Sequence, residues 1–390
     1  MRSFVLSAAL AALIVPPAAA QVDVQPLAAP DYFSLGLSDT GLGADLWRGT
    51  SADVAKAVLP KLAAKQLTPA AARLARQVLA TAAIGPGEAG RDPALAAARA
   101  DALLDLGRPY AAWAALERAQ GLSSNPALSQ AAAEAALFNG QDDAACRTAE
   151  QLATGRGESY WLRLRAYCQA RAGQGDAAEL TLTLANDATT SRLTRAVIAG
   201  EGGGEASLRD GIDYSLSRRL GLDLTAVTKG ASSAALAAVE SPGADRADAP
   251  IEGSRLAARL AAQQGREAEV DALFVQAAAA EAKARGRYQS ALLIAAALGA
   301  PFTESQRGTF AGFDVPAGTV AANRLAALDL AAAAGLKGET ALLALDIAAD
   351  AGAKIRPADT ARVVAALHRA GLGEAAVAFA DEALTTLQVQ

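Results

Sequence analysis

The chain has 390 residues, of which 52% are hydrophobic and only 4% aromatic, and its formal net charge is −5. Much of the apolar content is alanine, which favours helices, whereas the β-branched and aromatic residues that strands favour are sparse. This composition predicts an all-α protein. A mildly acidic chain without a basic block gives no electrostatic reason to expect binding to nucleic acid or to an anionic membrane.

Residues 1–20 have the pattern of a secretory signal peptide. Arg2 supplies a positive charge, residues 4–15 form an apolar run too short to span a bilayer, and three alanines before residue 21 fit the signal peptidase rule. We expect cleavage after Ala20 and export to the periplasm or beyond. The alternative is an uncleaved N-terminal helix. No other segment reaches the apolar length of a transmembrane helix, so no integral membrane span is expected.

The first half of the mature chain is expected to be an irregular arm followed by helices. Residues 21–50 contain scattered proline and glycine, which is typical of irregular structure. Residues 51–200 are expected to form an array of helices. The predicted helices span residues 51–65, 68–83, 92–106, 111–120, 127–138, 142–153, 158–172 and 176–185.

The second half begins with a less regular stretch. Residues 201–254 are expected to be an insertion and linker region with short helices at 214–219 and 234–239. Helices then resume over residues 255–390. The predicted spans are 255–264, 267–285, 319–334, 339–350, 361–370 and 374–387, with an interruption at 301–318. We expect one curved array with two insertions; the alternative is two lobes joined near residues 241–249.

Three glycines recur at intervals of 33 residues: Gly107, Gly140 and Gly173. Each stands between two runs of small apolar residues. Such spacing is typical of stacked helical hairpins, in which neighbouring units complete the core.

This pattern resembles tetratricopeptide repeats, which place a glycine at the turn between two helices and a small residue five positions later. The matching pairs are Gly107 with Ala112, Gly140 with Ala145, Gly173 with Ala178 and Gly371 with Ala376, and Gly265 with Val270 is a poorer match. The large residues of the family's first helix are mostly alanine here, and the repeat length is irregular after residue 185. The resemblance implies a right-handed α-solenoid of antiparallel hairpins and says little about function.

Cys146 and Cys168 are expected to form a disulfide bond, because an exported chain with two cysteines favours pairing. The turn between the two predicted helices lies at residues 155–157, so the cysteines would be nearly level in an antiparallel pair. The alternative is two buried thiols. No metal site is expected, since two cysteines and one distant histidine do not supply four ligands.

The sequence contains no recognisable catalytic constellation. His368 is the only histidine and stands in the last turn of a predicted helix, where it is expected to be a capping or surface residue. The glycine-rich run at 200–204 lacks the lysine and spacing of a phosphate-binding loop. We therefore expect no catalytic residue, no cofactor and no enzymatic activity.

Two clusters of aromatic and basic residues are candidate interface positions, because such residues are enriched at interfaces. They are Arg163, Arg165, Tyr167, Tyr214, Arg218 and Arg219. The alternative for the first cluster is core packing by Trp161 and Leu164 beside the disulfide, with solvated arginines.

The sequence thus predicts an exported, non-catalytic scaffold or adaptor that binds a protein or peptide partner, for instance in an envelope assembly. The alternative is an accessory protein bound to cell-wall glycan, since exported helical arrays resemble the non-catalytic superhelix of lytic transglycosylases. Neither hypothesis involves nucleic acid or a cofactor.

Overall fold

The computed structural model describes residues 31–389 apart from 203 and 228. The predicted signal peptide and its cleavage site lie outside the described residues. Within the described part, the regular secondary structure is helical, and the only β-type contact is an isolated bridge between Leu37 and Thr81. The all-α prediction is confirmed.

The helices before residue 241 begin with α1 beside the N-terminal arm. Their bounds are α1 Ala52–Ala64, α2 Pro69–Ala80, α3 Pro93–Asp105, α4 Pro109–Leu116, α5 Pro126–Phe138, α6 Asp142–Gln151, α7 Ser159–Arg171, α8 Gly175–Ala185, α9 Ala188–Ala199, α10 Gly211–Arg219 and α11 Ser233–Glu240. The later helices are α12 Leu256–Ala261, α13 Arg266–Ala279, α14 Ala282–Ala297, α15 Glu304–Ala311, α16 Ala322–Ala333, α17 Lys337–Ala351, α18 Pro357–Arg369 and α19 Gly373–Thr386. Short 3₁₀ helices are η1 Tyr32–Ser34, η2 Gly87–Arg91 and η3 Gly352–Lys354.

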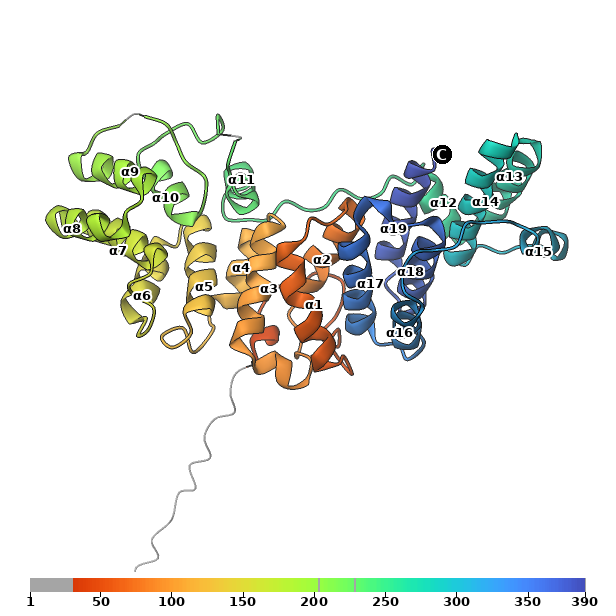
Figure 1. Ribbon diagram of the computed structural model, residues 1–390, viewed down its shortest axis with the longest axis horizontal. Coiled ribbons are helices and arrows are strands. Elements are labelled where there is room, and N and C mark those ends of the chain that lie inside the picture. Colours follow the sequence, from red (N-terminus) through yellow and green to blue (C-terminus); the bar gives the residue numbers. More distant parts are fainter. Residues whose placement is uncertain (1–30, 203, 228, 390) are drawn as a thin grey trace, which may run out of the picture.

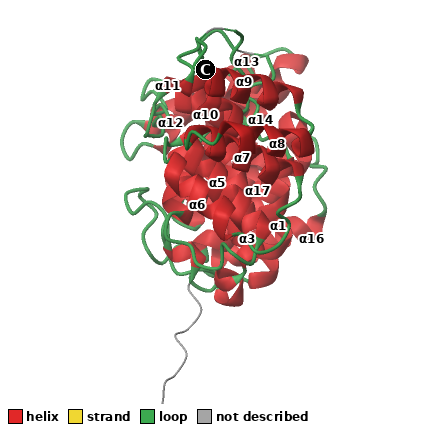
Figure 2. Ribbon diagram, turned by 90° about the vertical axis from the view of Figure 1, so that its left-hand side faces the viewer, coloured by secondary structure: helices red, strands yellow, loops and turns green. Residues whose placement is uncertain are grey.

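The helices form an elongated arch whose order in space differs from their order in the chain (Figure 1). The chain starts in the middle with α1 and α2, builds one end through α10, and crosses back over the middle before building the other end. It then returns, so that α17 contacts α1 and α2, and α19 contacts α2. Viewed along the arch, the helices stack one behind another with loops at the edges (Figure 2).

The joint between α1 and α17 depends on a close approach of backbone to side chain. Gly338 lies so near the N-terminal arm that a Cβ there would be 2.6 Å from the Trp47 ring, and its N–H donates to the Leu46 carbonyl at 2.9 Å. Lys61 of α1 pairs with Asp346 of α17 at 2.6 Å. The first and last thirds of the chain therefore share one continuous core.

The three regularly spaced glycines end helices α3, α5 and α7 with the same motif. Gly107, Gly140 and Gly173 have φ of 69°, 71° and 76°, a left-handed conformation that glycine adopts without strain. In each case the glycine N–H donates to the carbonyl three residues back, and the next N–H donates five residues back. This pair of backbone hydrogen bonds is the Schellman motif, which satisfies the last carbonyls of a helix.

The structure corrects the predicted helices in three places. Helix α9 was not predicted, and α15 replaces part of the predicted interruption. The predicted single helix over residues 267–285 is wrong, because α13 ends at Ala279 and a separate helix, α14, begins at Ala282. The break at Ala280 and Glu281 carries no glycine or proline, so the alanine-rich pattern gave no stop signal there.

The predicted disulfide is confirmed. Cys146 of α6 and Cys168 of α7 are bonded, with their Cα atoms 5.7 Å apart. The bond joins two units at one end of the arch, beside a small core cluster that contains Trp161 and Tyr167.

Candidate functional site

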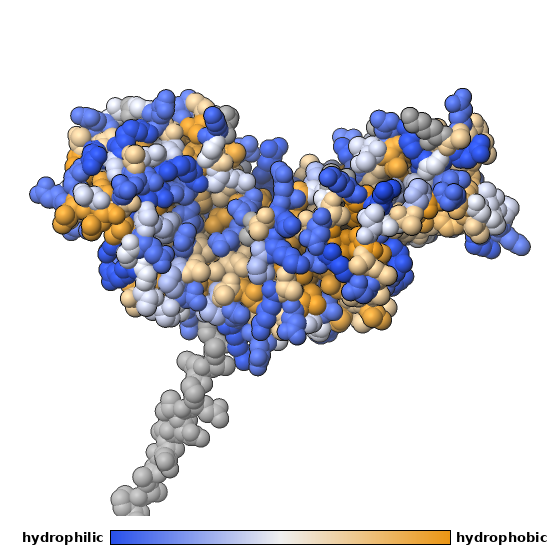
Figure 3. Space-filling view, in the orientation of Figure 1, coloured by the Kyte–Doolittle hydropathy of each residue, from blue (hydrophilic) through white to orange (hydrophobic). Residues whose placement is uncertain are grey.

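The upper side of the arch is hollow between its two raised ends (Figure 3). Residues 241–255, which connect α11 with α12, cross this side above the central helices without regular secondary structure (Figure 1). We call this segment the strap. It is the longest connection between consecutive helices that runs over the hollow, and its contacts define the candidate site.

Three arginines form the floor beneath the strap. Arg73 and Arg76 are three residues apart on α2, so they lie on the same face of that helix. Arg108 immediately precedes α4, whose first residue is Pro109. Arg73, Arg76, Arg108 and the N-terminus of α4 together make up what we call the cationic groove.

Asp245 of the strap caps α4. Its two carboxylate oxygens accept hydrogen bonds from the backbone N–H groups of Tyr110 at 3.0 Å and Ala111 at 2.8 Å. The residue at the ordinary capping position, Arg108, makes no side-chain cap. A carboxylate distant in sequence therefore satisfies amides at the positive end of this helix.

Asp248 of the strap forms ion pairs with two arginines. Arg76 donates from Nη2 at 2.5 Å and from Nε at 3.2 Å, and Arg108 Nη2 lies 2.9 Å from the same carboxylate. The fork of Arg76 matches a carboxylate in two places, which gives geometric specificity as well as attraction. Arg73 completes the contact by donating to the Ala249 carbonyl at 2.7 Å.

Over residues 243–250 the strap is held by these polar contacts, whereas Ile251 near its end packs partly buried against the core. Asp245 and Asp248 are half-buried, whereas Arg246, Ala247 and Ala249 are exposed. Burial raises the pKa of Asp245, and this effect outweighs the two amides and Arg108, which lower it. The loss of hydration thus offsets part of what the hydrogen bonds contribute. A segment held in this way belongs to the weakly held parts of a fold.

The groove is not filled by the strap. A cavity of about 390 Å³ remains beside it, with the three arginines and the strap aspartates on one side and Leu37 and Thr40 of the N-terminal arm on another. Asp39 of the N-terminal arm and Glu374 at the start of α19 also line it. There is therefore room for additional chain beside the segment already bound.

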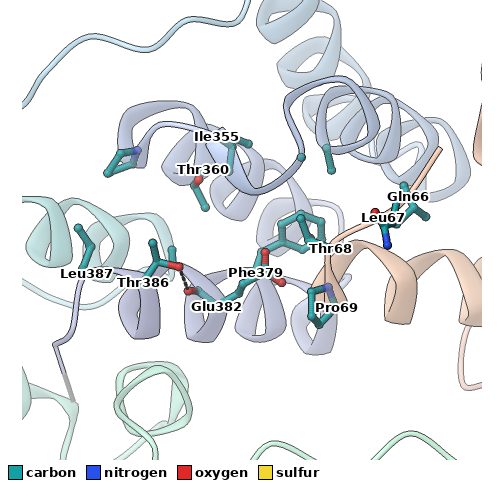
Figure 4. Close-up of a pocket in the computed structure, with 14 residues that line it drawn as sticks. Gln66, Leu67, Thr68, Pro69, Ile355, Thr360, Phe379, Glu382, Thr386 and Leu387 are labelled. Atoms are coloured by element: carbon teal, nitrogen blue, oxygen red, sulfur yellow. Dashed lines mark hydrogen bonds between the residues drawn. The ribbon is translucent and has the colours of Figure 1, made fainter.

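A second cavity of about 410 Å³ lies where the start of α2 meets α18 and α19 (Figure 4). Its walls are largely apolar and include Ile355, Phe379 and Leu387. The carboxylate of Glu382, which also lines it, accepts a hydrogen bond from Ala70 N–H at 2.8 Å and so caps α2. Because that acid is engaged in capping, this cavity offers less polar chemistry than the cationic groove.

Three of the six predicted interface residues are drawn into the fold. Arg163 lies among α7, α9 and α10, where it donates to Asp210 at 2.5 Å and to Thr190 at 2.8 Å. Tyr167 and Tyr214 are buried. Trp161 and Leu164 are also buried, as the core-packing alternative predicts, but Arg163 is ion-paired rather than solvated.

The other three candidate positions are more accessible. Arg165 is half-buried and donates to the Arg156 carbonyl. Arg218 and Arg219 are exposed, and Arg218 pairs with Asp142 at 2.8 Å and lies over the Tyr214 ring. These exposed positions lie on the end of the arch that α5–α10 build, away from the cationic groove.

The network around Arg163 contains a buried acid that sequence reasoning missed. One oxygen of Glu134 accepts a hydrogen bond from Gly211 N–H at 2.7 Å, and the other oxygen is buried. Burial and then the charge of Asp210 raise the pKa of Glu134, against the opposing effects of Gly211, Tyr160 and Arg163. The acid belongs to the interior of this end and borders neither of the two cavities described above.

Among the described residues, no group of three or more histidine, cysteine, aspartate or glutamate side chains is placed to hold a metal ion. His368 lies exposed in the last turn of α18. In the same part of the chain, no helix is both long and apolar enough to cross a membrane.

Comparison of the chain with models of protein families, with curated proteins and with solved structures gives no match. Sequence reasoning missed the groove because the strap reads locally as a linker of proline, glycine, aspartate and alanine. The one available signal was the pair Asp245 and Asp248, three residues apart in a segment whose other residues are mostly small.

Proposed function

We propose that this protein is an exported, non-catalytic scaffold or adaptor that binds a protein or peptide partner through the hollow side of a helical array. The array would be a tetratricopeptide-like solenoid of antiparallel hairpins. The observation that carries the proposal is the strap: an extended stretch of chain already lies in the cationic groove, held by side-chain and backbone contacts that another chain could also make.

Recognition of an extended segment by a preformed surface depends on this combination of contacts. Arg73 binds a backbone carbonyl, which any peptide offers, whereas Arg76 and Arg108 select a carboxylate. The central helices that carry these groups are packed against both halves of the chain, so the groove is held by a rigid frame. Export is supported by the pattern of residues 1–20 alone.

Affinity purification after in-cell cross-linking tests the proposal. A tagged full-length chain should enrich a defined protein partner over a tag-only control. Sedimentation with purified peptidoglycan should leave the protein in the supernatant. Recovery of the tagged chain without any enriched protein, or its sedimentation with peptidoglycan, would overturn the proposal, and the second result would favour a glycan-associated role.

A further inference from the structure

The strap shows which chemistry the cationic groove recognises. Its two anchoring side chains are both carboxylates, and each meets a different cationic element: Asp245 the N-terminus of α4, and Asp248 the arginine pair. In an extended chain, side chains three residues apart are separated by about 10 Å. The groove therefore binds two carboxylates at a fixed spacing. The two residues between them are exposed, so the groove does not select their side chains by size.

We propose that the cationic groove binds an extended acidic segment of the partner, with two carboxylates three residues apart, and that the strap is the internal segment which this partner displaces. The inference rests on the proposed function and names the partner's chemistry at that same site.

Charge complementarity supports an acidic partner. Arg73, Arg76 and Arg108 converge on one groove. They outnumber the two acids outside the strap that also line it, Asp39 and Glu374. When the strap leaves, two half-buried arginines lose their carboxylate, and the amides of Tyr110 and Ala111 lose their acceptor. Leaving such groups unpaired is unfavourable, so a vacated groove would favour another carboxylate pair in its place.

The way the strap is attached supports displacement. Arg246 and Ala247 are exposed, and residues 243–250 contain no large apolar side chain; Ile251, which packs partly buried against the core, lies just beyond this stretch. Its ends are fixed to α11 and α12, and Arg255 is further held by Asp381 at 2.7 Å. The strap therefore stays close to the groove after release and competes with the partner as a tethered ligand.

Peptide binding to the full-length protein provides the test. The probe is a fluorescent peptide with the sequence of residues 243–250, and its control has asparagine in place of both aspartates. The D245N/D248N variant weakens the internal ligand, so it should bind the probe at least about tenfold more tightly than the unmodified protein. E150Q changes an exposed glutamate on α6 that does not line the groove, and it should leave affinity unchanged.

The arginines provide the complementary measurement. Adding R76Q/R108Q to D245N/D248N should abolish the gain, and raised salt should weaken probe binding in D245N/D248N. Equal affinities in the unmodified protein and D245N/D248N, or equal binding of the aspartate and asparagine probes, would overturn the inference. Circular dichroism of each variant shows whether the helices are retained, and R73Q offers a milder change if R76Q/R108Q unfolds.

This inference and the proposed function fail in different ways. If a partner is captured from cells but R76Q/R108Q captures it equally well, the scaffold function stands and the groove assignment is wrong. If no partner is captured while the acidic probe binds as described, the groove assignment stands and the proposed scaffold function is wrong.

Discussion

At the scale of single residues, buried arginines hold separate elements of the fold together. Arg99 is 1% exposed and donates to the carbonyls of Tyr32, Leu79 and Thr81, so it fixes the described part of the N-terminal arm to α2. Arg163 of α7 likewise joins its helix to α9 and α10, through hydrogen bonds to Thr190 and Asp210. Removing one member of such a network leaves its partners buried and unpaired.

Glu134 makes stability depend on pH. Its pKa is raised above the ordinary value of 4.5, so the folded protein keeps a proton that the unfolded chain releases. The free energy of unfolding therefore falls as pH rises above about 4.5, until the folded carboxyl also ionises. E134Q cannot ionise and should be more stable than the unmodified protein by about 1–2 kcal/mol at pH 7.

Urea denaturation between pH 4.5 and 8 measures this difference. The advantage of E134Q should grow with pH across that range, and E150Q, which changes an exposed glutamate on α6, should show no such trend. A difference that stays constant from pH 5 to 8 would contradict the assignment.

At the scale of helices, the disulfide between α6 and α7 links two successive units. It closes a loop with a sequence separation of 22 residues. A disulfide that closes a loop of this length lowers the conformational entropy of the unfolded chain and contributes about 2–4 kcal/mol to stability. The C146S/C168S variant should lose about that amount in denaturant titration, and reduction of the unmodified protein should produce a similar loss.

Thiol titration under denaturing conditions is the accompanying check. The purified, oxidised protein should show no free thiol. Two titratable thiols, or a denaturation midpoint unchanged in C146S/C168S, would contradict the bond between α6 and α7.

Local signals predicted many helices because they act within a few residues. The glycine turns at 107, 140 and 173 and the Thr68–Pro69 helix start are of this kind, and the structure has helix ends at each. Helices α9 and α15 were missed although each begins with a capping residue, Asp187 and Thr303, because polar residues around them resemble loops. The groove was missed for another reason: Asp248 and Arg76 meet only through tertiary folding.

At the scale of the whole molecule, helices from the first and last parts of the described chain meet near the centre of the arch. Helices α1 and α2 pack against α17 and α19, and the strap crosses the resulting central block (Figure 1). The groove arginines therefore belong to the part of the molecule supported from both sides. No single-sequence repeat pattern predicts this arrangement, because repeats imply neighbours in chain order.

The most direct test of the groove as a partner site compares capture from cross-linked cells by three proteins. These are the unmodified chain, D245N/D248N with a weakened strap, and R76Q/R108Q with a weakened groove. The proposed function and the groove assignment together predict that D245N/D248N enriches the partner more strongly than the unmodified chain and that R76Q/R108Q loses it. Equal enrichment of the same partner by all three proteins would contradict binding in the groove.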